Sequence, residues 1–226
     1  MTNEWIPTAA LFDMDGVIVD NMSYHEVAWQ AFCDAHGIPF SRETYYSQLN
    51  GKNALDSFTF LLGRVPSPEE LKRLTDEKEA LYRKNYAPFL APADGLVGFL
   101  HLLRERGVKT AVATSAPIEN VLFTIDGAGL RPLFDAVVDA SMVTNGKPAP
   151  DIYLKAAELV GVQPGRCVVF EDALLGIQAG KAAGMKVVGI ATSHEPEELA
   201  PLTDGVMHDF REIDWSHFEG LLGEKV

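Results

Sequence analysis

The sequence predicts an α/β fold, in which a Rossmann-like, three-layer core with a parallel sheet carries an inserted α-helical cap. From residue 96 onward, strand-like runs alternate with helix-like runs, a pattern typical of a parallel sheet covered on both faces. The apolar run at 8–12, bounded by Gly16, favours a buried opening strand. Between 21 and 90, helical patterns follow one another without a convincing strand. We therefore expect a core of residues 1–20 and 91–226 and a cap of residues 21–90.

Helical periodicity and capping residues predict three helices in the cap. Their expected ranges are 22–35, 54–62 and 68–86. Ser67 is expected to cap the third helix and Pro68 to stand in its first turn, because helix starts prefer these residue types. The segment 87–95 is rich in Pro and Gly and is expected to return the chain to the core.

The core pattern alternates regularly up to residue 191 and is less clear in the tail. There we expect short helices that begin at Glu195 and Trp215. The other expected core elements are helix 96–106, strand 108–113, helix 117–128, strand 136–139, helix 150–160, strand 167–171, helix 173–183 and strand 186–191.

The chain is acidic, with a formal net charge of −13 over 226 residues and a sequence pI of about 4.8. A surface of this sign repels nucleic-acid phosphates and anionic lipid headgroups, so we expect neither nucleic acid nor a membrane as a partner. An anionic substrate would have to be attracted by a few positioned cations. We expect the protein to act as a monomer on a small molecule.

Two features of the sequence predict a cytoplasmic protein. Cys33 and Cys167 are the only cysteines; the first stands in a helix-like stretch and the second opens an apolar strand, and both are expected to be buried free thiols, consistent with a reducing compartment. The N-terminal segment 1–12 has no basic residue before its short apolar run, which argues against a signal peptide. No apolar run approaches the roughly 20 residues of a membrane helix.

Two aspartates, Asp13 and Asp15, follow the first expected strand and precede the turn at Gly16. Because side chains alternate along an extended chain, both carboxylates can face one side, where they repel each other unless a cation or proton intervenes. Ligand sites in open α/β sheets lie beyond such strand ends. An Asp-x-Asp-Gly sequence can also be an ordinary turn. A calcium loop is excluded, because Leu11 and Met22 stand at its first and twelfth positions.

Polar residues also follow later strands. Thr114 and Ser115 end one strand, Lys147 lies in a loop, and Glu171 and Asp172 end another strand. Singly, each has an ordinary explanation as a helix cap or a solvated charge. Together they would bring carboxylates, hydroxyls and an ammonium to one edge of one sheet.

Four motifs, in order, closely resemble those of the haloacid dehalogenase superfamily of phosphotransferases. They are DMDGV at 13–17, the Thr114-Ser115 strand end, Lys147 followed by Pro-x-Pro, and EDALLGIQAG at 171–180. The resemblance covers nearly the whole chain, including a helical cap inserted after the first motif. The subgroup that the chain resembles contains small-molecule phosphatases and β-phosphoglucomutases.

The resemblance implies phosphoryl transfer through an aspartyl phosphate, with Mg²⁺ as cofactor. Asp13 would be the nucleophile and Asp15 the general acid and base. The Mg²⁺ ligands would be the Asp13 side chain, the Asp15 backbone carbonyl and Asp172, with Glu171 acting through water.

The resemblance also assigns roles to the middle motifs. Thr114 and the Ser115 backbone would donate hydrogen bonds to the phosphate, and Lys147 would neutralise Asp13 and the transferring group. It implies a cis peptide bond between Lys147 and Pro148, since X-Pro bonds are the usual place for cis peptides.

Three cap residues, His25, Lys52 and Lys78, are candidate substrate-binding or phosphate-binding residues. His25 and Lys78 fall where similar mutases carry a histidine and a lysine that link cap closure to the proton-transferring aspartate. The alternative is an ordinary helix residue and a solvated charge. Where those mutases have an arginine for the distal phosphate this chain has Ala54, and Asn21 stands where they have a threonine. A lysine does not reproduce the bidentate bonds of an arginine.

These features favour hydrolysis of small phosphorylated metabolites, with sugar phosphates as the leading class and pyrophosphate as another. The main alternative is a β-phosphoglucomutase-like isomerase that interconverts sugar 1- and 6-phosphates. Phosphonate-cleaving relatives use a cap lysine, for which Lys52 is the candidate, but they lack the second aspartate that is present here as Asp15. Receiver domains also gather aspartates, a hydroxyl and a lysine at strand ends, yet they lack a helical insertion.

Overall fold

A six-stranded parallel sheet forms the centre of the molecule in the computed structural model, which describes residues 7–211 and 213–222. The strand order is β3-β2-β1-β4-β5-β6, and Leu11 of β1 pairs with Ala111 on one side and Val169 on the other. The opening strand is therefore central. The expectation that segment 1–12 is not a signal peptide concerns residues 1–6 as well, and these lie outside the described residues. The strands are β1 (Ala9–Phe12), β2 (Lys109–Ala113), β3 (Ala136–Val138), β4 (Cys167–Glu171), β5 (Lys186–Ile190) and β6 (Gly205–Met207).

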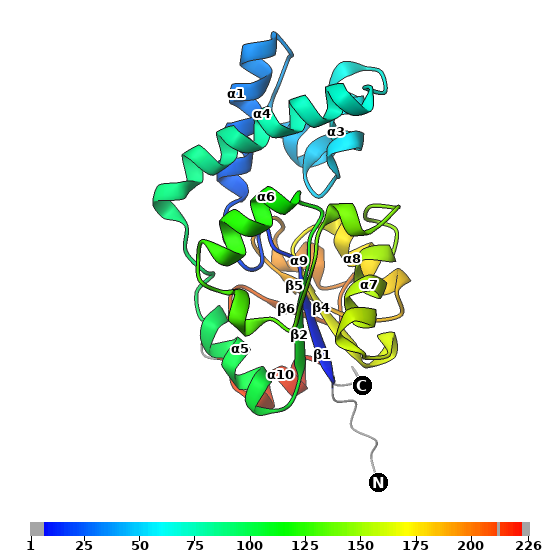
Figure 1. Cartoon of the computed structure of the whole chain (residues 1–226). Coiled ribbons are helices and arrows are strands. Elements are labelled where there is room, and N and C mark those ends of the chain that lie inside the picture. The colour runs from blue at the N-terminus through cyan, green and yellow to red at the C-terminus, as the bar shows by residue number, and fades with distance from the viewer. Residues whose placement is uncertain (1–6, 212, 223–226) are drawn as a thin grey trace.

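Helices cover both faces of this sheet (Figure 1). Alternate residues of β1 enter different apolar clusters, because side chains alternate across a strand: Phe12 packs with the helices of one face and Leu11 with those of the other. One face carries α5 (Leu96–Glu105), α6 (Ile118–Val121) and α10 (Trp215–Leu222), and the other carries α7 (Asp151–Val160), α8 (Leu174–Ala182) and α9 (Pro196–Leu199). The predicted α/β fold is confirmed.

The predicted helical insertion is also confirmed, and Figure 1 shows it beyond the end of the sheet where β1 leads into α1. It has its own apolar cluster, in which Trp29, Phe32 and Phe58 are buried together. Ser67 caps α4 by accepting a hydrogen bond from the Glu70 amide, as expected. The division of the chain at 20/21 and 90/91 stays a prediction. The insertion contains α1 (Met22–His36), α2 (Arg42–Thr44), a π-helical turn (Tyr45–Leu49), α3 (Ala54–Leu62) and α4 (Pro68–Tyr86).

Most predicted core elements agree with the structure to within one residue at each end. The expected helix 117–128 is instead α6 followed by a π-helical turn, Leu122–Asp126. The edge strand β6 was not predicted, because three residues are too few to show an alternating pattern. No helix of the described part of the chain is long and apolar enough to cross a membrane.

Candidate active site

The ends of β1 and β4 and the loop before α7 meet at one point, as predicted. Lys147 Nζ donates a hydrogen bond to Asp13 Oδ1 over 2.7 Å and another to the Glu171 carboxylate. Carboxylate oxygens of Asp13, Glu171 and Asp172 all lie within 4.8 Å of one another. The Lys147–Pro148 peptide bond is cis, as predicted. We call Asp13, Lys147, Glu171 and Asp172 the core acidic cluster.

The core acidic cluster is buried and carries three carboxylates against one ammonium. Burial raises the pKa of Asp13 to about 7 even though Lys147 lowers it, and Glu171 and Asp15 add to the rise. The pKa of Asp172 also lies well above its ordinary value, first because of burial and then because of Glu171 and Asp13. Burial is the first cause of both shifts, and the neighbouring carboxylates add to it. Clustered carboxylate oxygens suit a hard divalent cation such as Mg²⁺, so the residues present fit the predicted metal.

Asp15 lies in a different set of contacts from Asp13. The Asn21 side-chain amide donates to Asp15 Oδ1 over 2.6 Å, and His25 Nε2 lies 3.5 Å from the same oxygen. Burial by itself raises the pKa of Asp15, but His25 and Asn21 outweigh it and the net direction is downward. Asn21 also bonds to the Tyr82 hydroxyl, and the Tyr82 ring stacks on His25 at 3.8 Å between centroids.

The two cap residues named for proton transfer are buried and paired. Lys78 is only 3% exposed, and its Nζ lies 2.8 Å from His25 Nδ1 and 2.9 Å from Glu79 Oε1. It also lies 4.8 Å from the centroid of the Trp29 ring, which is a cation–π distance. The alternative of a solvated lysine at position 78 is therefore wrong, while the functional role of His25 stays a prediction.

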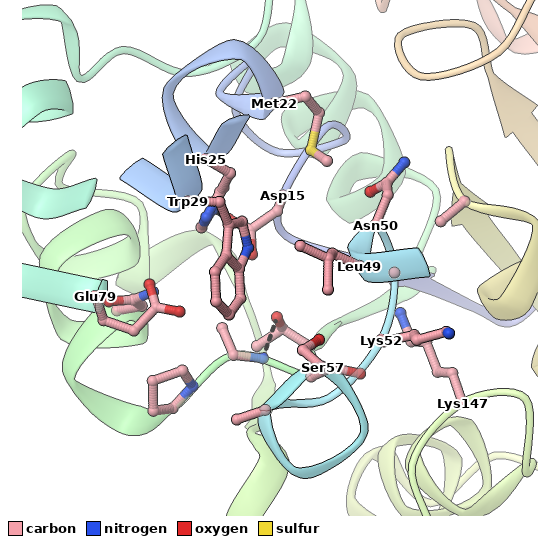
Figure 2. Close-up of a pocket in the computed structure, with 18 of the residues that line it drawn as sticks. Asp15, Met22, His25, Trp29, Leu49, Asn50, Lys52, Ser57, Glu79 and Lys147 are labelled. Carbon is pink, nitrogen blue, oxygen red and sulfur yellow. Dashed lines mark hydrogen bonds and ion pairs between the residues drawn. The ribbon is translucent and has the colours of Figure 1, made fainter. Parts of the chain in front are cut away.

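Lys52 differs from Lys78 in having no carboxylate partner among the described residues. Its Nζ donates a hydrogen bond to the Gln48 side-chain oxygen over 3.4 Å and lies 5.9 Å from the centroid of the Phe60 ring. Figure 2 shows Lys52 on the same side of the pocket as Lys147, with Glu79 on the opposite side. Its ammonium remains available for a ligand.

All of the predicted site residues line one pocket between the insertion and the core, with an empty volume of about 820 Å³. Thr114 is buried there and accepts a hydrogen bond from the Ala116 amide, and Ser115 lies beside it. Ala54 lies at the pocket as well, so an arginine is absent from that part of the wall.

Residues 7–184 match the family described as haloacid dehalogenase-like hydrolase. The chain belongs to this family. Its membership, together with the helical insertion, rules out the receiver-domain alternative. Within the family the chain falls in family IA, in the subgroup of β-phosphoglucomutases and sugar phosphate phosphatases.

Relatives of this hydrolase include both reaction types. The fructose-1-phosphate phosphatase YqaB of Escherichia coli (strain K12) is 36% identical, over 80% of this chain and 94% of its own length. The β-phosphoglucomutase of Bacillus subtilis (strain 168) is 35% identical, over 80% of this chain and 82% of its own length. A solved family IA, variant 3 hydrolase from Entamoeba histolytica HM-1:IMSS is 30% identical, with a TM-score of 0.85 over 95% of this chain and 98% of that one.

The structure of this hydrolase also reveals supporting residues that the sequence did not identify. The Tyr153 hydroxyl donates to Glu171 Oε1 over 2.8 Å, and the Ala173 amide donates to Oε2 over 2.9 Å. The Ser193 hydroxyl bonds to Asp172. Tyr153 comes from α7 and Ser193 from the loop after β5, and neither belongs to a motif that marks it as a partner of the acids.

Two glycines within the motifs make room for the acids. A Cβ atom at Gly176 would overlap the Glu171 carboxylate, and one at Gly16 would overlap that of Asp172. Gly16 also has a φ of 79°, which favours glycine. The glycines in DMDGV and EDALLGIQAG were visible signals of this close approach, although the sequence did not show what approached them.

Proposed function

We propose that this protein is a Mg²⁺-dependent phosphatase that hydrolyses small phosphorylated metabolites, with sugar phosphates as the leading class, through an aspartyl phosphate on Asp13. One observation carries the proposal. Asp13, bonded to Lys147, and Asp15, beside His25 and Asn21, open into the same pocket. The proposed nucleophile, Asp13, and the proposed proton-transferring group, Asp15, thus have different hydrogen-bonding partners.

The proposed reaction has two steps. The Asp13 carboxylate attacks phosphorus while the bond to the leaving oxygen breaks, and Asp15 gives that oxygen a proton. Asp15 then takes a proton from water, whose oxygen attacks phosphorus and releases Asp13 and inorganic phosphate. The contacts of Asp15 with His25 and Asn21 lower its pKa and so favour the ionised carboxylate that takes a proton from water in the second step.

Three core residues would stabilise the transferring group. Lys147 lies against Asp13 and would offset the charge that gathers on the phosphoryl oxygens. Thr114 and the Ser115 amide would donate hydrogen bonds to those oxygens.

Asp13 and Asp172 would hold Mg²⁺, together with the Asp15 backbone carbonyl and with Glu171 through water. When bound, the cation supplies charge neutralisation for the carboxylates and the incoming phosphate. The raised pKa values of Asp13 and Asp172 support this assignment, because a nearby cation would favour the ionised forms.

The sugar phosphate class is supported by the pocket wall and by relatives. Lys52 is a cation without a carboxylate partner in the described structure, and Ala54 offers no second cation beside it. Such a wall favours a substrate with one phosphate in the core and a mostly uncharged remainder. The related fructose-1-phosphate phosphatase has a substrate of that kind in its name.

A β-phosphoglucomutase-like isomerase is the second candidate. It is supported by the buried His25–Lys78 pair and by the Bacillus subtilis relative. A mutase must hold a bisphosphate at both ends, whereas hydrolysis needs one phosphate site.

A single experiment distinguishes the two. Phosphate release is measured over a panel of sugar phosphates, pyrophosphate and nucleotides with Mg²⁺, beside β-glucose 1-phosphate supplied with its bisphosphate. We expect multiple-turnover phosphate release from one or more sugar phosphates. Conversion of β-glucose 1-phosphate to the 6-phosphate faster than phosphate release would overturn the phosphatase proposal.

A further inference from the structure

A polar bridge joins the insertion to the core at the contact of α4 with α6. Asn120, on α6, is fully buried, and its Nδ2 donates to Glu79 Oε2 over 2.7 Å. Its Oδ1 accepts from Arg83 Nη1, also over 2.7 Å. Glu79 and Arg83 are four residues apart on α4 and so share one helix face. We call this set the Glu79–Asn120 bridge.

The orientation of the Asn120 amide is determined by its neighbours. A guanidinium has only donors, so the amide oxygen must face Arg83. The amide nitrogen then faces Glu79, and a carboxylate accepts its hydrogen bond. Turning the amide over would set donor against donor and acceptor against acceptor.

The same chain of contacts continues inward to Asp15. Glu79 Oε1 accepts from Lys78 Nζ, which lies 2.8 Å from His25 Nδ1. Because an ammonium has no acceptor, Nδ1 must accept, and the proton of the neutral imidazole is then on Nε2. His25 Nε2 faces Asp15 Oδ1 at 3.5 Å. Glu79 therefore holds Lys78, and Lys78 in turn determines which nitrogen of the His25 imidazole carries the proton.

Burial makes these contacts sensitive to one another. The side chains of Lys78 and Glu79 are 4% and 13% exposed, and Asn120 is fully buried. Removing one partner from a buried polar set leaves the next group without its hydrogen bond, which costs more than the same loss at the surface. Separation of α4 from α6 would take from Glu79 the donor that orients its carboxylate.

We propose that Glu79 and Asn120 are positioning residues, which couple docking of the insertion on α6 to the orientation of His25 toward Asp15. The inference rests on the proposed role of Asp15 as the proton-transferring group. Neither residue bonds to Asp15 itself. When α4 is docked on α6, His25 is held in the orientation in which its Nε2 faces Asp15, the proposed proton-transferring group.

A reciprocal exchange of amide and carboxylate tests the bridge. Asn120→Asp sets two carboxylates against each other, and Glu79→Gln sets two amides against each other. In the double variant, the amide at position 79 donates to the carboxylate at 120 and still accepts from Lys78, and the carboxylate still accepts from Arg83. We expect each single change to lower kcat about tenfold with KM within about twofold, and the double variant to recover to within about threefold of wild type. Glu70→Gln, the same change at a half-buried site on α4 where the carboxylate pairs with Arg64 and not with the bridge, is the matched control.

The tautomer of His25 gives a second readout that needs no turnover. Side-chain ¹⁵N spectra of the whole protein, with His25 identified by its loss in His25→Gln, are expected to show Nε2 protonated in wild type and in the double variant. Each single variant, and Asn120→Ala if a single variant fails to fold, should shift toward a mixture of tautomers. If wild type releases no phosphate but the spectra follow this pattern, the proposed function fails and the bridge stands.

Three results would overturn the inference. Single-variant losses that multiply in the double variant would show that the two residues act independently. A change confined to KM would make them direct substrate contacts. Wild-type kcat and an unchanged His25 spectrum in both single variants would leave the bridge without a role.

Discussion

The two ends of the pocket differ in how far their charges are compensated. At the core end, Asp13, Glu171 and Asp172 face Lys147 and retain an excess of negative charge. At the insertion end, Lys78 and Glu79 neutralise each other beside His25. The core end therefore keeps unbalanced negative charge, whereas at the insertion end the charges of Lys78 and Glu79 balance each other. In the proposed mechanism, the contacts at the core end serve phosphoryl transfer and those at the insertion end orient His25.

The largest expected effect comes from removing the nucleophile at the core end. Asp13→Asn should lower kcat on the order of a thousandfold or more, because an amide is a poor nucleophile. Steady-state phosphate release measures the loss, and a thermal unfolding midpoint near that of wild type shows that the fold survives. Residual activity above about a tenth of wild type would refute the assignment of Asp13.

The incomplete charge at the core end predicts a response to metal. Chelation should abolish turnover, and Mg²⁺ should raise the unfolding midpoint of wild type by several degrees, corresponding to about 2.7 kcal/mol at a hundred times its dissociation constant. Asp172→Asn should remove most of that rise, because it removes a proposed ligand. Calorimetric unfolding with and without Mg²⁺ measures it. An equal rise in Glu70→Gln, a carboxylate change distant from the site, is the control.

Close packing around the core end predicts a smaller effect on stability. Gly176→Ala should lower the free energy of unfolding by about 1–3 kcal/mol and reduce activity, because the methyl group would displace the Glu171 carboxylate. Gly98→Ala in α5, where a Cβ meets nothing within 4 Å, is the matched control and should be neutral or slightly stabilising. Denaturant unfolding compares them. Equal effects of the two changes would contradict the packing argument.

The smallest expected effect is a difference between the alkylation rates of the two cysteine thiols, one in each region. Cys33 lies in the insertion and Cys167 in the sheet, and burial raises the pKa of each to about 11. Both should react slowly with a neutral thiol reagent at pH 8, because the thiolate is the reactive form. Cys33 should react a few times faster, since its apolar cluster is smaller than that of Cys167 and is expected to open more readily. Peptide mapping after timed alkylation measures both rates, and faster reaction of Cys167 would reverse the comparison.

The candidate site residues of the core could be predicted from the sequence more fully than those of the insertion. Lys147 and Asp172 were assigned to the site because each stands at a strand or loop end within a recognisable motif. For His25 and Lys78 the sequence allows two explanations, because a helix position alone does not tell whether a side chain is buried. Asn120 had no signal, since its role depends on the approach of α4 to α6.

The sequence by itself determined most of the strands and helices, the presence of a helical insertion and the acids at the strand ends, because periodicity, capping and turn chemistry are local properties. Only the tertiary structure decided that Lys78 is buried between His25 and Glu79, that Tyr153 and Ser193 hold the acids, and that β6 closes the sheet edge. Each of these depends on contacts between residues far apart in the chain or on burial. Such properties follow from how elements pack, and no short stretch of sequence contains them.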